Sequence, residues 1–126
     1  MKVAFSTLGC PNWTWSEIIS TAKDFGYQGI EVRGVKSEIF APAIKEFSDN
    51  EIEKTMKKLT DLGLSIPCFT TGCIMGKGNA VSEGKAYIDL AEKTGTPYIR
   101  VLGDAEPAPG ENIDDTAVIK GLKELC

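Results

Sequence analysis

One passage from helix to strand occurs three times in this chain. The segments AKDFGYQGIEV, LTDLGLSIPCF and AEKTGTPYIRV each combine a helical pattern, a glycine and a run of strand-forming residues. The glycines Gly26, Gly63 and Gly95 are 37 and 32 residues apart, a period that suits a repeated βα unit. Units that alternate strictly between strand and helix favour a parallel sheet with right-handed crossovers. The repeat therefore predicts an α/β fold.

Hydrophobic periodicity predicts four strands and four helices. We expect the strands at residues 3–6, 29–33, 64–69 and 98–102. Capping boxes at residues 14–17 and 48–51 begin the first two helices, the third helix runs to Gly95, and the fourth begins near Ile113. Segment 34–47 is expected to be a long loop with one short turn of helix, and 70–80 a glycine-rich loop. The helical residues expected to face inward are Ile18, Ala22, Phe25, Ile52, Met56, Leu59, Ala86, Tyr87, Leu90, Ala91, Val118, Ile119, Leu122 and Leu125.

Four βα units fit either half of a (β/α)₈ TIM barrel, which takes about 250 residues when complete, or an open doubly wound sheet. The open sheet requires a phosphate-binding glycine turn after its first strand, where this chain has LGCPNW. We therefore expect residues 1–126 to be a single domain, half a barrel with parallel strands in the order 1-2-3-4 and helices on the convex side. Such a half exposes two strand edges and, we expect, a concave apolar face with inward residues such as Phe5 and Ile66, or their strand neighbours.

Charge and composition exclude several classes of protein. The 126 residues include 14 Lys and Arg, 18 Asp and Glu, and no histidine, giving a net charge of −4. This balance argues against a nucleic-acid partner, and the missing histidines remove His-based triads and His-containing metal sites. No run of about 18 apolar residues is present, so no membrane partner is expected. Four scattered cysteines indicate reduced thiols and a cytoplasmic protein.

Three segments carry a resemblance to a known family. VAFSTLGCPNWTWSEIISTAKDFGYQGIEVRG, LGLSIPCF and YIDLAEKTGTPYIRVLGD resemble the N-terminal half of the sugar phosphate isomerase/epimerase family, the xylose isomerase-like TIM barrels. The resemblance implies metal-assisted proton transfer at C1/C2 or C3 of a sugar, with a divalent ion such as Mn²⁺ or Mg²⁺. The family's metal ligands and acid–base carboxylates lie on later strands. We therefore expect no catalytic residue, metal ligand or cofactor in this chain, which alone would be inactive.

Candidate substrate-binding residues follow from the strand ends, where TIM-barrel sites lie. They are Cys10, Trp13, Glu31, Thr70 and Arg100. Trp13 either stacks on a sugar or staples the first helix by packing on Ile18. Cys10 and Thr70 follow the first and third predicted strands.

Glu31 and Arg100 are the charged candidates. Glu31 alternates with Ile30 and Val32, so its carboxylate should point into the barrel interior. It forms either a buried ion pair with Arg100 or Arg33, or a contact with substrate. Arg100 either joins that ion pair or binds a hydroxyl or phosphate bidentately.

Two hypotheses about function follow. The first is the N-terminal part of a sugar isomerase/epimerase that binds a sugar or sugar phosphate. The alternative is a stand-alone half-barrel that acts as a binding or assembly module without catalysis. Either form is expected to self-associate because of its open edges. The glycine-rich segment 72–78 does not match a Walker A phosphate loop, because only three residues separate its first two glycines and a glycine follows Lys77.

Overall fold

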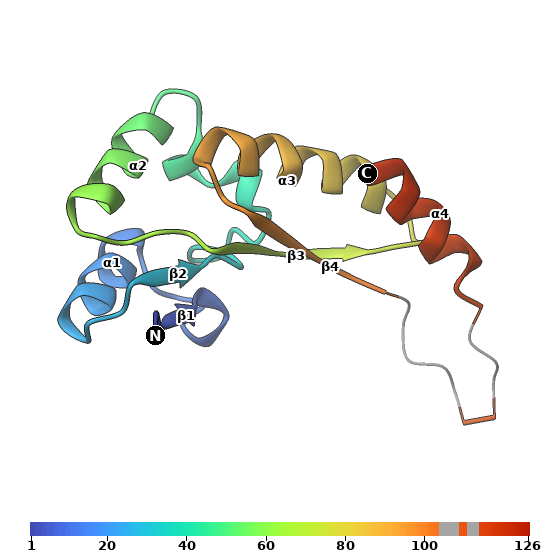
Figure 1. The fold of residues 1–126 in the computed structure, drawn as a ribbon, viewed down its shortest axis with the longest axis horizontal. Helices are drawn as coiled ribbons and strands as arrows, with labels where there is room; N and C mark the ends of the chain where they lie inside the picture. The colour runs from blue at the N-terminus through green and yellow to red at the C-terminus, as the bar shows by residue number, and fades with distance from the viewer. Residues whose placement is uncertain (104–108, 111–113) are drawn as a thin grey trace.

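The computed structural model describes residues 1–103, 109–110 and 114–126 of the chain (Figure 1). Strands and helices alternate along it, so the predicted α/β class is confirmed. The strands are β1 Ala4–Ser6, β2 Gly29–Glu31, β3 Cys68–Ile74 and β4 Tyr98–Leu102; the helices are α1 Trp15–Asp24, α2 Ile52–Asp61, α3 Ala80–Thr94 and α4 Thr116–Leu125. Short 3₁₀ turns lie at Thr7–Gly9, Ala41–Ala43 and Lys45–Phe47. The predicted start of the last helix, Ile113, lies outside the described residues.

Parallel pairing joins strands that are neighbours in sequence. β1 pairs with β2, and β3 pairs with β4, which gives two sheets of two strands each. Parallel bridges from Gly29 to Ser65 and from Val32 to Phe69 connect the two sheets. The amide of Val32 donates to the Cys68 carbonyl at 3.1 Å, and the Thr70 amide donates to the Val32 carbonyl at 2.9 Å. The backbone of β2 therefore also contacts the start of β3.

The third strand lies further along the chain than predicted. We expected residues 64–69, but β3 runs from Cys68 to Ile74 and includes the first part of the predicted glycine-rich loop. Pro67 has no amide hydrogen, so it cannot donate to a strand ladder and separates the bridge at Ser65 from β3 proper. The strand continues through Ile74, which pairs with Leu102, after an irregularity in register.

The two predicted capping boxes have different outcomes. At α1 the Glu17 amide donates to Thr14 Oγ1 at 3.3 Å, and the Thr14 amide donates to Glu17 Oε2 at 2.7 Å. At α2 the prediction is wrong, because the N-cap is Glu51 and no side chain caps the helix. Here the backbone carbonyl of Ser48 accepts from the Ile52 amide at 2.9 Å, so a turn of backbone precedes the helix where a side-chain cap was expected.

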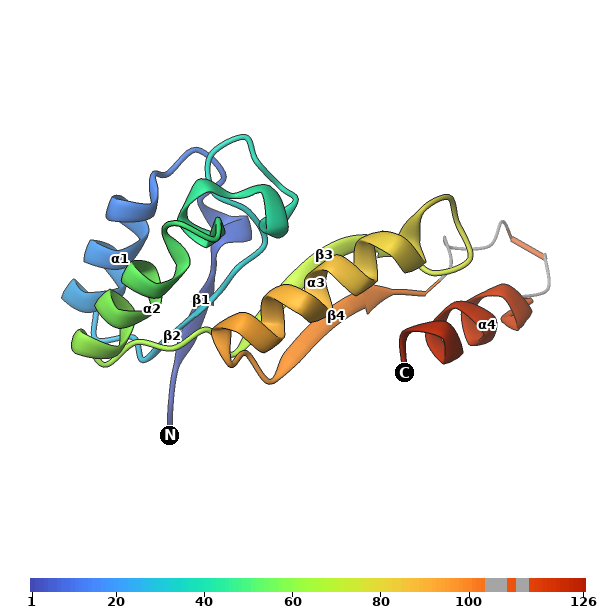
Figure 2. The same ribbon diagram turned by 90° about the horizontal axis from the view of Figure 1, so that it is seen from above.

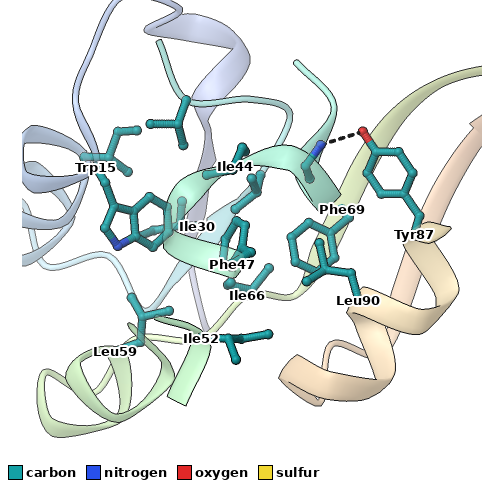
Figure 3. Close-up of a cluster of buried hydrophobic side chains, with 14 of the residues drawn as sticks. Trp15, Ile30, Ile44, Phe47, Ile52, Leu59, Ile66, Phe69, Tyr87 and Leu90 are labelled. Carbon is teal, nitrogen blue, oxygen red and sulfur yellow. Dashed lines mark hydrogen bonds between the residues drawn. The ribbon is translucent and has the colours of Figure 1, made fainter. Parts of the chain in front are cut away.

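The core lies between the strands and the helices, and the long segment 34–47 contributes to it (Figure 3). The Phe47 ring packs edge-on against Trp15 of α1 and against Phe69 of β3, with centroid separations of 5.5 Å in both cases. The Tyr87 hydroxyl of α3 accepts a hydrogen bond from the Ala41 amide at 3.1 Å. Segment 34–47 is therefore a packed element with two 3₁₀ turns, more ordered than the loop we predicted.

Most helical residues predicted to face inward do so, but three do not. Phe25, Ile119 and Leu122 are exposed. Phe25 is the C-cap of α1 and so lies past its last turn. Helix α4 contacts the rest of the chain through Gly121, whose Cα region faces Met75, and through Leu125, which lies against Gly84 of α3. This contact uses one narrow stripe of α4 and leaves Ile119 and Leu122 outside it.

The strands present two different faces. Residues Ile30, Val32 and Phe69 are buried on the side of the helices, and Figures 1 and 2 show α3 lying along β3 and β4. The opposite side, here called the open face, carries Ser6, Glu31, Cys68, Thr70, Tyr98 and Arg100, because side chains alternate along a strand.

The predicted apolar concave face is wrong. Ile66 is 3% exposed and belongs to the core, and Phe5 packs against Tyr27 with a ring-centroid separation of 5.0 Å. The open face, which no helix covers among the described residues, therefore bears mainly polar groups. Among the described residues, no helix has the length and hydropathy needed to cross a membrane.

Candidate functional site

Glu31 is at the centre of the open face. Its Oε1 atom accepts a hydrogen bond from Ser6 Oγ at 3.2 Å and a second one from Thr70 Oγ1. Ser6 lies directly opposite Glu31 in the β1–β2 register, and Thr70 lies on β3. The carboxylate thus connects three strands that are far apart in sequence. Both donors are neutral hydroxyls, and the carboxylate that they contact is half-buried.

The predicted ion pair of Glu31 is wrong. Within the described part of the chain, the ion pairs are Lys54–Glu51, Lys57–Asp61 and Lys93–Asp49, all on the surface. Arg33 is directed elsewhere, since its Nη1 donates to the Ile39 carbonyl at 2.9 Å. Two hydroxyl groups contact one oxygen, Oε1, of the carboxylate that we expected an arginine to neutralise. The other expectation for Glu31, contact with a substrate, stays a prediction.

Arg100 and Thr70 lie opposite each other in the β3–β4 register, so the Arg100 guanidinium belongs to the same face as Glu31. Arg100 is exposed. Both charged groups affect the pKa of the Cys68 thiol. Burial raises the pKa of the Cys68 thiol, the Glu31 carboxylate raises it further, and a Thr70 hydrogen bond and the Arg100 charge oppose the rise. The thiol is therefore protonated at neutral pH.

Ser6 and Cys68 are site residues that the sequence reasoning missed. The signal was present, because Cys68 and Thr70 are two residues apart on one strand and must share a face. Ser6 falls at the end of β1, where TIM-barrel sites lie, but its hydroxyl was not singled out.

The other two predicted residues lie in a separate place. Cys10 and Trp13 line a pocket of about 340 Å³ beside β1. Its remaining lining residues are Phe5, Ser6, Gly9, Thr21, Phe25 and Tyr27. Burial raises the pKa of the Cys10 thiol, which disfavours the reactive thiolate. Ser6 touches both regions, yet the apolar lining of this pocket differs from the polar open face. The five predicted residues thus form two groups.

The described residues do not fit a metal centre. No group of three or more cysteine, aspartate or glutamate side chains within residues 1–103, 109–110 and 114–126 could hold an ion, and the sequence has no histidine. The divalent metal implied by the family resemblance has no ligand set here. All four cysteines are free thiols.

Comparisons with known proteins add no assignment. A scan against protein-family models, a search of curated proteins and a search of solved structures each found no match. The resemblance to sugar phosphate isomerases therefore depends on the residues of this chain alone.

Proposed function

We propose that residues 1–126 form the first four βα units of a sugar isomerase/epimerase barrel and supply part of its substrate-binding wall. Parallel pairing of β1 with β2 and of β3 with β4 supports this proposal. The bridges at Gly29–Ser65 and Val32–Phe69 support a continuous strand order of 1-2-3-4, because they link β2 to the segment that continues into β3. In a barrel the open face would be the interior wall.

The observation that carries the proposal is the pattern of hydrogen bonds to the two oxygens of the Glu31 carboxylate. Both of its hydrogen bonds end on Oε1, so Oε2 has no partner among the described residues. A carboxylate oxygen has lone pairs for further donors, and a sugar is a dense array of hydroxyl donors. The Ser6 and Thr70 hydroxyls hold the Glu31 side chain in place from the two neighbouring strands. The side chain therefore loses less conformational entropy when a ligand binds.

Arg100 supplies the complementary group. Its guanidinium presents five N–H donors in a planar fork that matches a phosphate or a pair of hydroxyls. It lies on β4, across Thr70 from the Glu31 carboxylate, so one ligand on the open face can contact an acceptor and a donor group. A sugar phosphate has hydroxyl donors for the Glu31 carboxylate and phosphate acceptors for the Arg100 guanidinium. The isomerisation step itself would need acid–base groups that the resemblance places on later strands, so this chain binds without catalysing.

Binding calorimetry with ribulose and ribulose 5-phosphate tests this proposal. Glu31→Gln should weaken the binding of both probes by roughly tenfold or more, because a hydrogen bond to a charged group contributes about 1.5–3 kcal/mol. Arg100→Ala should weaken the phosphate ester more than the free sugar. Glu53→Gln makes the same change on the exposed surface of α2 and should leave both affinities unchanged.

Two outcomes contradict the proposal. The first is wild-type affinity in Glu31→Gln. The second is ketose–aldose turnover by this chain with Mn²⁺ that is lost in Glu31→Gln, because that would place the catalytic site within these residues.

The second candidate function, a non-catalytic assembly module, is favoured by a different observation. Large apolar side chains reach solvent mainly on the first and the last βα units.

A further inference from the structure

Exposed large apolar side chains are concentrated at the two ends of the strand order. The first unit exposes Met1, Val3, Leu8, Trp13 and Phe25, and the last units expose Ile88, Tyr98, Ile119 and Leu122. Between residues 26 and 87 the described chain has a single such residue, Ile39. Scattered exposed apolar residues are ordinary on a protein surface, but their concentration in the first and the last units indicates two surfaces that require cover.

Both ends also carry an unpaired strand edge. Among the described residues β1 pairs with β2 alone and β4 pairs with β3 alone. A free edge presents backbone N–H and C=O groups that another strand can bind. The apolar pocket beside β1, with Trp13 and Phe25 in its lining, borders the first edge, and Tyr98 lies on β4 at the second.

The chain exposes more surface than a compact monomer of its mass. The chain has 7965 Å² of accessible surface, whereas a compact monomer of 13.6 kDa has about 6,600 Å². The chain as a whole therefore exposes about 1,400 Å² more than a compact monomer, and each partner of a standard complex buries roughly 800 Å².

We propose that a second copy of this chain covers both ends. Edge β4 of each copy lies parallel to edge β1 of the other, in a two-fold dimer whose axis runs along the strands. One partner then satisfies both edges, whereas pairing β1 with β1 would leave both β4 edges open. Such closure turns the two open faces toward each other, so Glu31 and Arg100 of both copies line one interior. The inference concerns this chain by itself and does not depend on sugar binding.

Sedimentation velocity across the micromolar range tests the proposal. The wild-type chain should sediment as a dimer of twice 13.6 kDa that dissociates on dilution. Phe25→Asp and Tyr98→Asp change one residue at each edge. Each should raise the dimer Kd by about tenfold or more, because it puts a charge where the dimer would bury an apolar side chain. Ile39→Asp makes the same change at a comparably exposed site in the middle of the chain and should leave the Kd unchanged.

Each alternative outcome overturns the proposal. A monomer at every concentration would show that no dimer forms. Species that keep growing beyond the dimer would show that copies join edge to edge without closing. An effect of only one of the two edge variants indicates a like-with-like interface. Circular dichroism of each variant should match that of the wild type, since all three substituted side chains are largely exposed.

Discussion

The hydroxyl of Tyr87 offers the sharpest test of how segment 34–47 is held in the core. Tyr87 on α3 is 1% exposed, and its hydroxyl accepts from the Ala41 amide at 3.1 Å and donates to the Ile39 carbonyl at 3.2 Å. Burial raises the pKa of Tyr87, so the hydroxyl stays protonated and can donate. Tyr87→Phe removes one oxygen atom and both of these hydrogen bonds.

The expected cost follows from the groups left behind. Ala41 is fully buried, so its amide would have no water to replace the lost hydroxyl. A buried donor without a partner costs about 1–3 kcal/mol. We expect the free energy of unfolding to fall by about 2 kcal/mol, a large part of the 5–15 kcal/mol that typical domains have. For a domain of this size the melting temperature should fall by roughly 8 °C.

Urea unfolding followed by circular dichroism measures this change. Tyr27→Phe is the matched control, because Tyr27 is half-buried and its hydroxyl has no hydrogen-bond partner among the described residues. It should change the stability by less than about 0.5 kcal/mol. Equal and small effects of the two substitutions would refute the claim that Tyr87 anchors this segment.

Two further predictions concern local structure. Thr14→Ala should cost about 1 kcal/mol of stability at pH 7, since it removes the cap of α1. Hydrogen bonds from Thr14 hold the Glu17 pKa below its usual 4.5, so the Glu17 contribution is present above that pH; urea titrations should show it lost as the pH falls through the lower folded value. Gly34→Ala should cost about 2 kcal/mol in thermal melts, because the new Cβ would lie 2.7 Å from the Glu38 carbonyl oxygen, whereas Gly9→Ala, with no atom within 4 Å, should cost almost nothing.

Elements with strong local signals could be predicted from the sequence. The Thr14–Glu17 box positions α1 correctly, and the apolar spacing of Ile18 and Ala22 gives its buried face. The alternation around Glu31 correctly assigns this residue to the side of the strands away from the helices. These features depend on residues close together in sequence, where periodicity is informative.

Features that depend on contacts between distant segments could not be predicted. The partners of Glu31 are set by how β1 and β3 align with β2, and residue spacing does not determine that alignment. Phe47 enters the core because Trp15 and Phe69 provide edge-on contacts, which no local pattern in segment 34–47 reveals. Phe25 has the correct helical spacing for burial but lies beyond the last turn of α1.

NMR titration of the isotope-labelled chain with ribulose 5-phosphate tests most directly the proposal that the open face binds a sugar phosphate. We predict saturable shifts of the backbone amide signals of Ser6, Glu31, Thr70 and Arg100, because these residues carry the groups that would contact the ligand. Amides of the exposed surface of α2 should not shift. Saturable shifts confined to the pocket around Cys10 and Trp13, or no shifts at millimolar ligand, would contradict the claim.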